Sequence, residues 1–195
     1  MNLLDRFKLW RLRQLKSAQR HVEGTHLGVA KHVVLLYKHH SAERSQDLLE
    51  WKREVQAHGT PNLQVIPMAY WWQGKSKKNN ENEVTTPFHE LPQPWLNFNE
   101  HAVSTWRKPK SIELRRFINT EFDLLLYCET EPCWVLEEIL ARSKAKMKVG
   151  PSGLVRSNDL DIILSHPNGQ QTFESHMNGM VEFLTQAPLQ SSREK

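Results

Sequence analysis

The chain has 195 residues and a mass of 22.9 kDa, enough for one compact domain that buries its own core. Its two cysteines cannot form a disulfide framework, and no apolar run approaches the ~18 residues that span a membrane. The formal charge of +4 is concentrated in residues 1–20, where six cations accompany one carboxylate, so the remainder of the chain is nearly neutral. Because the N-terminus also lacks the apolar core of a secretory signal, we expect a cytoplasmic protein whose basic end meets an anionic partner.

Residues 1–21 are predicted to form a basic amphipathic helix, since they contain no Gly or Pro and are rich in Leu, Arg, Lys and Gln. The apolar arc of this helix is expected to comprise Leu3, Leu4, Phe7, Trp10 and Leu15. Three uses of the helix stay open at this point. It can dock on its own domain with a solvated basic face, bind RNA or a ribonucleoprotein, or lie on an anionic membrane surface.

Residues 22–31 connect this helix to a body at residues 32–187, in which apolar runs typical of strands alternate with helical patterns. We expect strands at 32–37, 62–72, 101–106, 122–128, 146–150 and 160–166. We expect helices at 42–58, 110–120 and 131–145, and a last one from residue 173, before a frayed tail at 188–195. Such alternation predicts an α/β fold with a single doubly wound, mainly parallel sheet, that is, a Rossmann-like or flavodoxin-like three-layer sandwich.

Local signals refine this prediction at three positions. Pro67 has no N–H to give to a ladder, so the second strand should be bulged or lie near an edge of the sheet. The third helix should begin at Pro109 or Ser111, and Thr130 should cap the fourth.

Ligands of such sheets bind beyond the carboxyl ends of the strands, which here offer few reactive groups. No glycine follows the first strand, and no glycine-rich phosphate loop occurs anywhere, so we expect no nucleotide cofactor. No cysteine–histidine spacing suggests a metal site. Weak catalytic candidates at the strand ends are His39, Cys128, Glu129 and His166. Each has a structural explanation, such as a buried thiol or a solvated loop histidine, and Asp123 is expected to satisfy backbone at a strand start.

An irregular insertion at residues 73–97, with the segment after it, interleaves lysines and arginines with tryptophans. Cations contact phosphates and aromatic faces stack on bases, so this loop and the basic helix form the predicted nucleic-acid-binding set. That set is Arg6, Lys8, Arg11, Arg13, Lys16, Arg20, Trp72, Lys75, Lys77, Lys78, Arg107 and Lys108. A further basic cluster, at Arg142, Lys144, Lys146 and Lys148, is interpreted as a surface feature.

The stretch RKPKSIELRRFINTEFDLLLYCETEPCWVLEEILARSKAKMKVGP, with LDIILSH and the closing helix, resembles a small bacterial family known only as a domain of unknown function. The resemblance covers about residues 30–186 and is most specific over 107–150. It implies a cytoplasmic Rossmann-like domain and supplies no catalytic residue. A fainter similarity of the same segment to the acceptor domain of heptosyltransferases concerns the fold alone, because this chain is about half as long and has no sugar-nucleotide half.

These observations favour a non-enzymatic cytoplasmic protein that engages RNA or a ribonucleoprotein, such as the ribosome, through its basic helix and aromatic–basic loop. Two alternatives stay open. One is a small-ligand binder or transferase-like enzyme that works at the strand carboxyl ends, and the other is a peripheral membrane adaptor.

Overall fold

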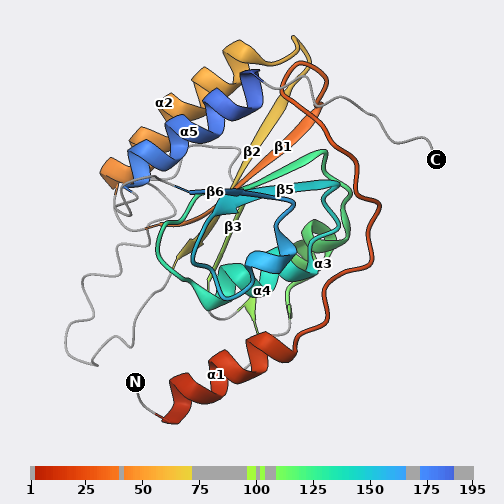
Figure 1. Cartoon of the computed structure of the whole chain (residues 1–195), viewed down its shortest axis with the longest axis vertical. Helices are drawn as coiled ribbons and strands as arrows, with labels where there is room; N and C mark the ends of the chain where they lie inside the picture. The colour runs from red at the N-terminus through yellow and green to blue at the C-terminus, as the bar shows by residue number, and fades with distance from the viewer. Residues whose placement is uncertain are drawn as a thin grey trace.

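The computed structural model of the chain describes residues 3–39, 42–71, 96–99, 102–103, 109–165 and 172–186. Within this part, six parallel strands form one sheet in the order β3-β2-β1-β4-β5-β6 (Figure 1). The strands are β1 (His32–Lys38), β2 (Gln64–Trp71), β3 (Leu96–Asn99), β4 (Leu124–Tyr127), β5 (Met147–Pro151) and β6 (Ile162–Leu164). This is the Rossmann strand order, and the order reverses between β1 and β4. The predicted α/β class with one doubly wound parallel sheet is confirmed.

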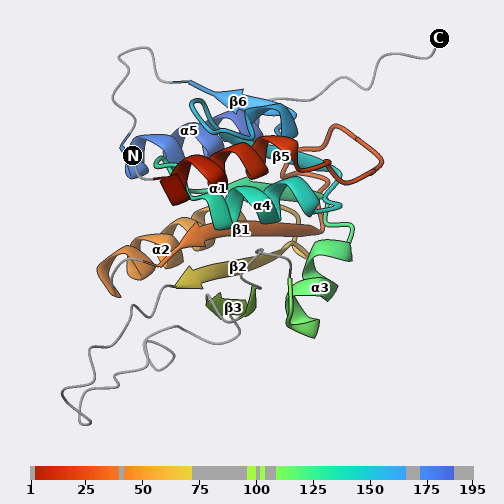
Figure 2. The same ribbon diagram turned by 90° about the horizontal axis from the view of Figure 1, so that it is seen from below.

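Helices cover both faces of this sheet. They are α1 (Leu3–Gln14), α2 (Ala42–His58), α3 (Ile112–Asn119), α4 (Trp134–Arg142) and α5 (Phe173–Gln186). One core lies under α2 and α5 and a second under α3 and α4, because alternate residues of the central strands point to opposite faces. Figure 2 shows α1 alongside α4, outside the three main layers.

The apolar runs locate the central strands well. All four residues of β4 are buried, as are five of the seven in β1, which is what a sheet covered on both faces requires. Pro67 pairs with Leu35 of β1, just before the point where β3 begins to pair with β2 at Met68. Its missing N–H therefore lies near the edge of the sheet, as predicted.

The third strand and one helix start differ from the prediction. The strand beside β2 is β3, whereas 101–106 was expected; of those residues the structure describes only 102–103, and Val103 forms an isolated antiparallel bridge with Pro109. Ser111 caps α3 by accepting a hydrogen bond from the Leu114 N–H at 3.1 Å, one of the two starts foreseen. Thr130 does not cap α4, whose N-cap residue is Cys133.

The buried face of α1 is rotated around the helix from the predicted one. Phe7 and Trp10 are 44% and 58% exposed, whereas Leu12, outside the predicted arc, is 4% exposed. The helix ends at Gln14, and residues 15–20 continue without helical structure, although a helix through residue 21 was expected. The reason lies in polar partners on the body, which draw the Arg11 and Leu12 side of the helix inward.

Candidate nucleic-acid interface

Residues 3–20, called the N-terminal segment below, are fastened to the body by the guanidinium of Arg156. Its Nη1 donates to the carbonyl of Leu12 at 3.1 Å and its Nη2 to the Ser17 hydroxyl at 2.9 Å, while Nε binds Asp159. Ser17 also donates to Asp159. The Leu12 carbonyl belongs to the last turn of α1, where a cation is favourable. One buried arginine thus holds the segment on both sides of the helix end.

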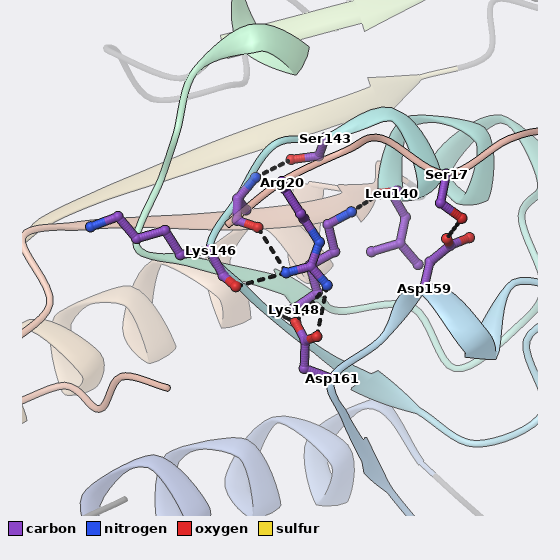
Figure 3. A network of polar contacts seen from close by, with 9 residues as sticks. Ser17, Arg20, Leu140, Ser143, Lys146, Lys148, Asp159 and Asp161 are labelled. Carbon is purple, nitrogen blue, oxygen red and sulfur yellow. Dashed lines mark hydrogen bonds and ion pairs between the residues drawn. The ribbon is translucent and has the colours of Figure 1, made fainter. Parts of the chain in front are cut away.

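A second attachment lies at the amino ends of β5 and β6 (Figure 3). Arg20 donates to both carboxylate oxygens of Asp161 at 2.7 and 2.8 Å and to the Lys146 carbonyl at 2.7 Å. Asp161 also accepts the Lys148 N–H at 2.8 Å, so the same carboxylate joins the N-terminal segment to both strands. The Arg20 side chain is only 10% exposed, so its charge serves an ion pair within the protein and is not presented to a partner.

The third attachment is a carboxylate shared by two arginines. Glu138 on α4 lies 3.2 Å from Arg11 and 3.0 Å from Arg142, and its side chain is 7% exposed. Two guanidinium groups on one carboxylate leave a net positive charge at the surface of α4. Arg11 is thus partly withdrawn from solvent, but the site around it stays cationic.

Three cations of the N-terminal segment, Arg6, Arg13 and Lys16, remain exposed and form no ion pair within the described part of the chain. Lys16 also borders an open hollow of about 340 Å³ between the segment, α3 and the end of α4. Its described lining includes Arg115 and Arg142 but no carboxylate, and the other described lining residues are Ala18, Pro109, Ile118 and Asn119. This hollow is the candidate interface.

The hollow combines residues that the sequence analysis had kept apart. Arg115 was not among the predicted binding residues, and Arg142 had been placed in a separate surface cluster. Arg115 donates to the carbonyls of Lys110 at 2.9 Å and Ser111 at 3.4 Å, so backbone oxygens rather than an acid orient its guanidinium. The repeated basic residues of RKPKSIELRR carried a signal for this site, although not for its link to Lys16.

Lys148, expected at the surface, is instead 1% exposed. Its Nζ donates to the Leu140 carbonyl in the last turn of α4 at 2.6 Å. Burial, and secondarily the positive charge of Arg20, lowers the pKa of Lys148 to about 8. Lys148 lies on β5, an interior strand, so its side chain caps a helix end from within the fold.

The strand-end candidates that the structure describes are held by the backbone. The buried Cys128 thiol donates to the Leu126 carbonyl at 3.4 Å, and Glu129, 2% exposed, accepts the Lys38 N–H at 2.8 Å. The His39 N–H donates to the Tyr70 carbonyl at 2.7 Å, which extends the pairing of β1 with β2. Glu129 thus links the ends of β1 and β4, where the strand order reverses.

Asp123, just before β4, accepts the N–H groups of Lys31 and His32 at 2.9 and 3.0 Å, as predicted. Partial burial raises the pKa of Asp123, but these hydrogen bonds and the Lys146 ammonium outweigh it and lower the pKa overall. No group of three or more His, Cys, Asp or Glu able to hold a metal occurs among the described residues.

Several predicted site residues lie outside the described residues. They are the side chain of Lys8 and all of Trp72, Lys75, Lys77, Lys78, Arg107, Lys108 and His166. Trp71, the last residue of β2, is 3% exposed and part of the body.

The strand order, the crossover helices and the absence of a phosphate loop define a Rossmann-like α/β protein with an added basic N-terminal segment. The chain belongs to a family of unknown function, DUF6913, whose profile matches residues 5–184, so the match includes most of the N-terminal segment. This confirms the predicted membership of a domain-of-unknown-function family. No curated protein and no solved structure matches the chain, and a similarity to heptosyltransferases is not shown. None of the described helices combines the length and the apolar character needed to cross a bilayer.

Proposed function

We propose that this chain binds RNA, alone or within a ribonucleoprotein, through a cationic face made by the N-terminal segment, α3 and the end of α4. The observation that carries the proposal is the hollow lined by Lys16, Arg115 and Arg142, with no carboxylate among its described lining residues. Three cations around a concave surface attract a polyanion, and RNA presents regularly spaced phosphates.

The cations of the hollow are available to a phosphate because few carboxylates of the protein itself neutralise them. Arg142 shares Glu138 with Arg11, and neither Lys16 nor Arg115 has an acidic partner in the described part of the chain. Because carbonyl oxygens already orient the Arg115 guanidinium, little side-chain freedom is lost when its remaining donors meet a phosphate.

The exposed residues of α1 extend this face. Arg6 and Arg13 each lie about one helical turn from Trp10, on the side of the helix that points away from α4. An exposed indole between two guanidinium groups is suited to stack on an unpaired base while the cations contact flanking phosphates. The aromatic–basic loop around Trp72 and Arg107 remains part of the proposal as a second contact.

The test is the affinity of the full chain for fluorescently labelled single-stranded and duplex RNA, measured by anisotropy. Lys16→Glu with Arg115→Glu is expected to weaken binding roughly 10- to 100-fold at moderate salt, because two phosphate contacts become repulsive. The matched control is Lys31→Glu with Arg53→Glu, which changes the charge equally at two exposed cations outside the hollow and should bind nearly as the unmodified chain does.

Equal losses in the two double variants would contradict the proposal, because they would reflect net charge rather than a site. Binding of anionic lipid vesicles but not of RNA, abolished by the hollow variant, would instead assign the face to a membrane surface.

A further inference from the structure

Helices α2 and α5 lie on the side of the sheet opposite α1 (Figure 1). A groove of about 380 Å³ lies between these two helices. Four carboxylates line it: Asp47, Glu50 and Glu54 from α2 and Glu174 from α5. Among the described residues no lysine or arginine lines it, and none of the four carboxylates forms an ion pair with a described cation. The molecule is therefore polarised, with a cationic face on one side of the sheet and an anionic groove on the other.

Apolar side chains form most of the rest of this groove. Trp51 is 5% exposed, and its Nε1 donates to the Met177 carbonyl at 3.0 Å, so the polar edge of the indole is already satisfied. Met177, Phe173 and Asn178 of α5 are the other described lining residues. A ligand for this groove should combine an aromatic or aliphatic group with flanking cations.

The exposed stripe of α1 has this composition and the same spacing. Arg6, Trp10 and Arg13 follow i, i+4, i+7, and Asp47, Trp51 and Glu54 on α2 follow the same interval with opposite charge. Seven residues of helix rise about 10 Å, so the two cations of one helix can reach the two carboxylates of the other. On each helix the indole lies between the two charged residues. Trp10 is 58% exposed and lies 5.9 Å from the Phe7 ring, so an aromatic surface is already presented to solvent.

We propose that α1 of one molecule docks in the α2–α5 groove of a second copy of this chain, with Trp10 against the groove and Arg6 and Arg13 on its carboxylates. Because Arg156, Arg20 and Glu138 fix the N-terminal segment to its own body, the contact is head-to-tail. Such contacts build open chains or rings rather than a closed two-fold dimer. This inference goes beyond RNA binding and does not rest on it. Because Arg6, Trp10 and Arg13 cannot make both contacts at once, a molecule with a docked α1 binds RNA through the hollow alone.

The test is sedimentation velocity of nuclease-treated full-length protein from about 10 µM to about 1 mM, a range suited to weak contacts. We expect association that grows with concentration at about 50 mM salt and is suppressed at about 500 mM. Two variants each place like charges across the contact: Arg6→Glu with Arg13→Glu, and Asp47→Lys with Glu54→Lys. Each alone should associate at least about 100-fold more weakly than the unmodified chain.

An equimolar mixture of the two variants provides the decisive measurement, because α1 of each variant has the charge opposite to that of the α2–α5 groove on the other variant. The mixture should return to within about threefold of the unmodified association, which also shows that both variants are folded. Glu113→Lys with Glu131→Lys, exposed acids outside the groove, should leave association unchanged.

The Lys16→Glu, Arg115→Glu variant separates the two proposals, since it should bind RNA roughly 10- to 100-fold more weakly and still self-associate. A chain that stays monomeric throughout would overturn this inference and leave the groove to some other cationic segment. Failure of the mixture to recover, or undiminished association of either variant alone, would overturn it as well.

Discussion

Arg156→Ala is expected to lower the free energy of unfolding by about 3 kcal/mol, because it removes one member of a buried ion pair and leaves the other uncompensated. Arg156 and Asp159 are 8% and 4% exposed, and the variant also removes the guanidinium donor from the Leu12 carbonyl, which keeps only the Leu15 N–H at 3.2 Å. Burial raises the pKa of Glu137, and the positive charge of Arg156 opposes this shift, so Glu137 is sensitive to the loss of that charge. The backbone N–H of Arg156, which donates to the Glu137 carboxylate at 2.8 Å, is kept in the variant. For a chain of this length the melting temperature should fall by roughly 6–12 °C.

The measurement is urea unfolding together with limited trypsin digestion. The N-terminal segment of Arg156→Ala should be cut well before the body, because its strongest attachment is lost. Arg156→Lys keeps the charge without the forked donors and should recover part of the stability. Arg116→Ala, an exposed residue of α3, is the control and should change stability by less than about 0.5 kcal/mol. A similarly small change in Arg156→Ala, with unaltered digestion, would show that the segment is not held as described.

The second prediction is that Lys148 makes the free energy of unfolding increase as the pH rises above about 8. Its pKa is about 8 in the folded protein, below the ~10.4 of an unfolded lysine, so the unfolded chain binds more protons between these values. The free energy of unfolding therefore rises with pH in this window on account of Lys148. The reverse holds for Cys133, because burial raises the pKa of its thiol and the unfolded chain loses that proton first.

Comparison with Lys148→Met separates the two effects, because only the lysine contribution differs. From about pH 7 to about pH 9.5 the unmodified chain should gain about 2 kcal/mol relative to the variant, measured by urea unfolding at each pH. Parallel stability profiles of the two proteins would mean that Lys148 titrates as an exposed lysine does.

The elements that the sequence predicts well are those whose burial follows from short-range pattern alone. β1 and β4 are continuous apolar runs because helices cover both of their faces, and α5 buries Met177, Met180 and Leu184 at helical intervals. β3 was missed since LNFN is short and half polar, and its identity as a strand depends on pairing with the last residues of β2.

The candidate site was only partly predictable because its charges are placed by partners distant in sequence. Arg11 finds Glu138 across 127 residues, and Arg156 finds Leu12 across 144. These contacts turn Leu12 inward and Trp10 outward, against the hydropathy pattern of α1. The composition placed the excess positive charge in the N-terminal segment. It could not show which of these cations would form ion pairs with the body and which would line the hollow beside Arg115.

The most direct test of an RNA-binding cationic face is the dependence of RNA affinity on salt concentration. For single strands each phosphate contact contributes about 0.7 to the slope of log affinity against log salt. Lys16→Glu with Arg115→Glu should therefore make the slope shallower by about 1.4, whereas Lys31→Glu with Arg53→Glu should leave it unchanged. An identical slope for the hollow variant and the unmodified chain would contradict the account.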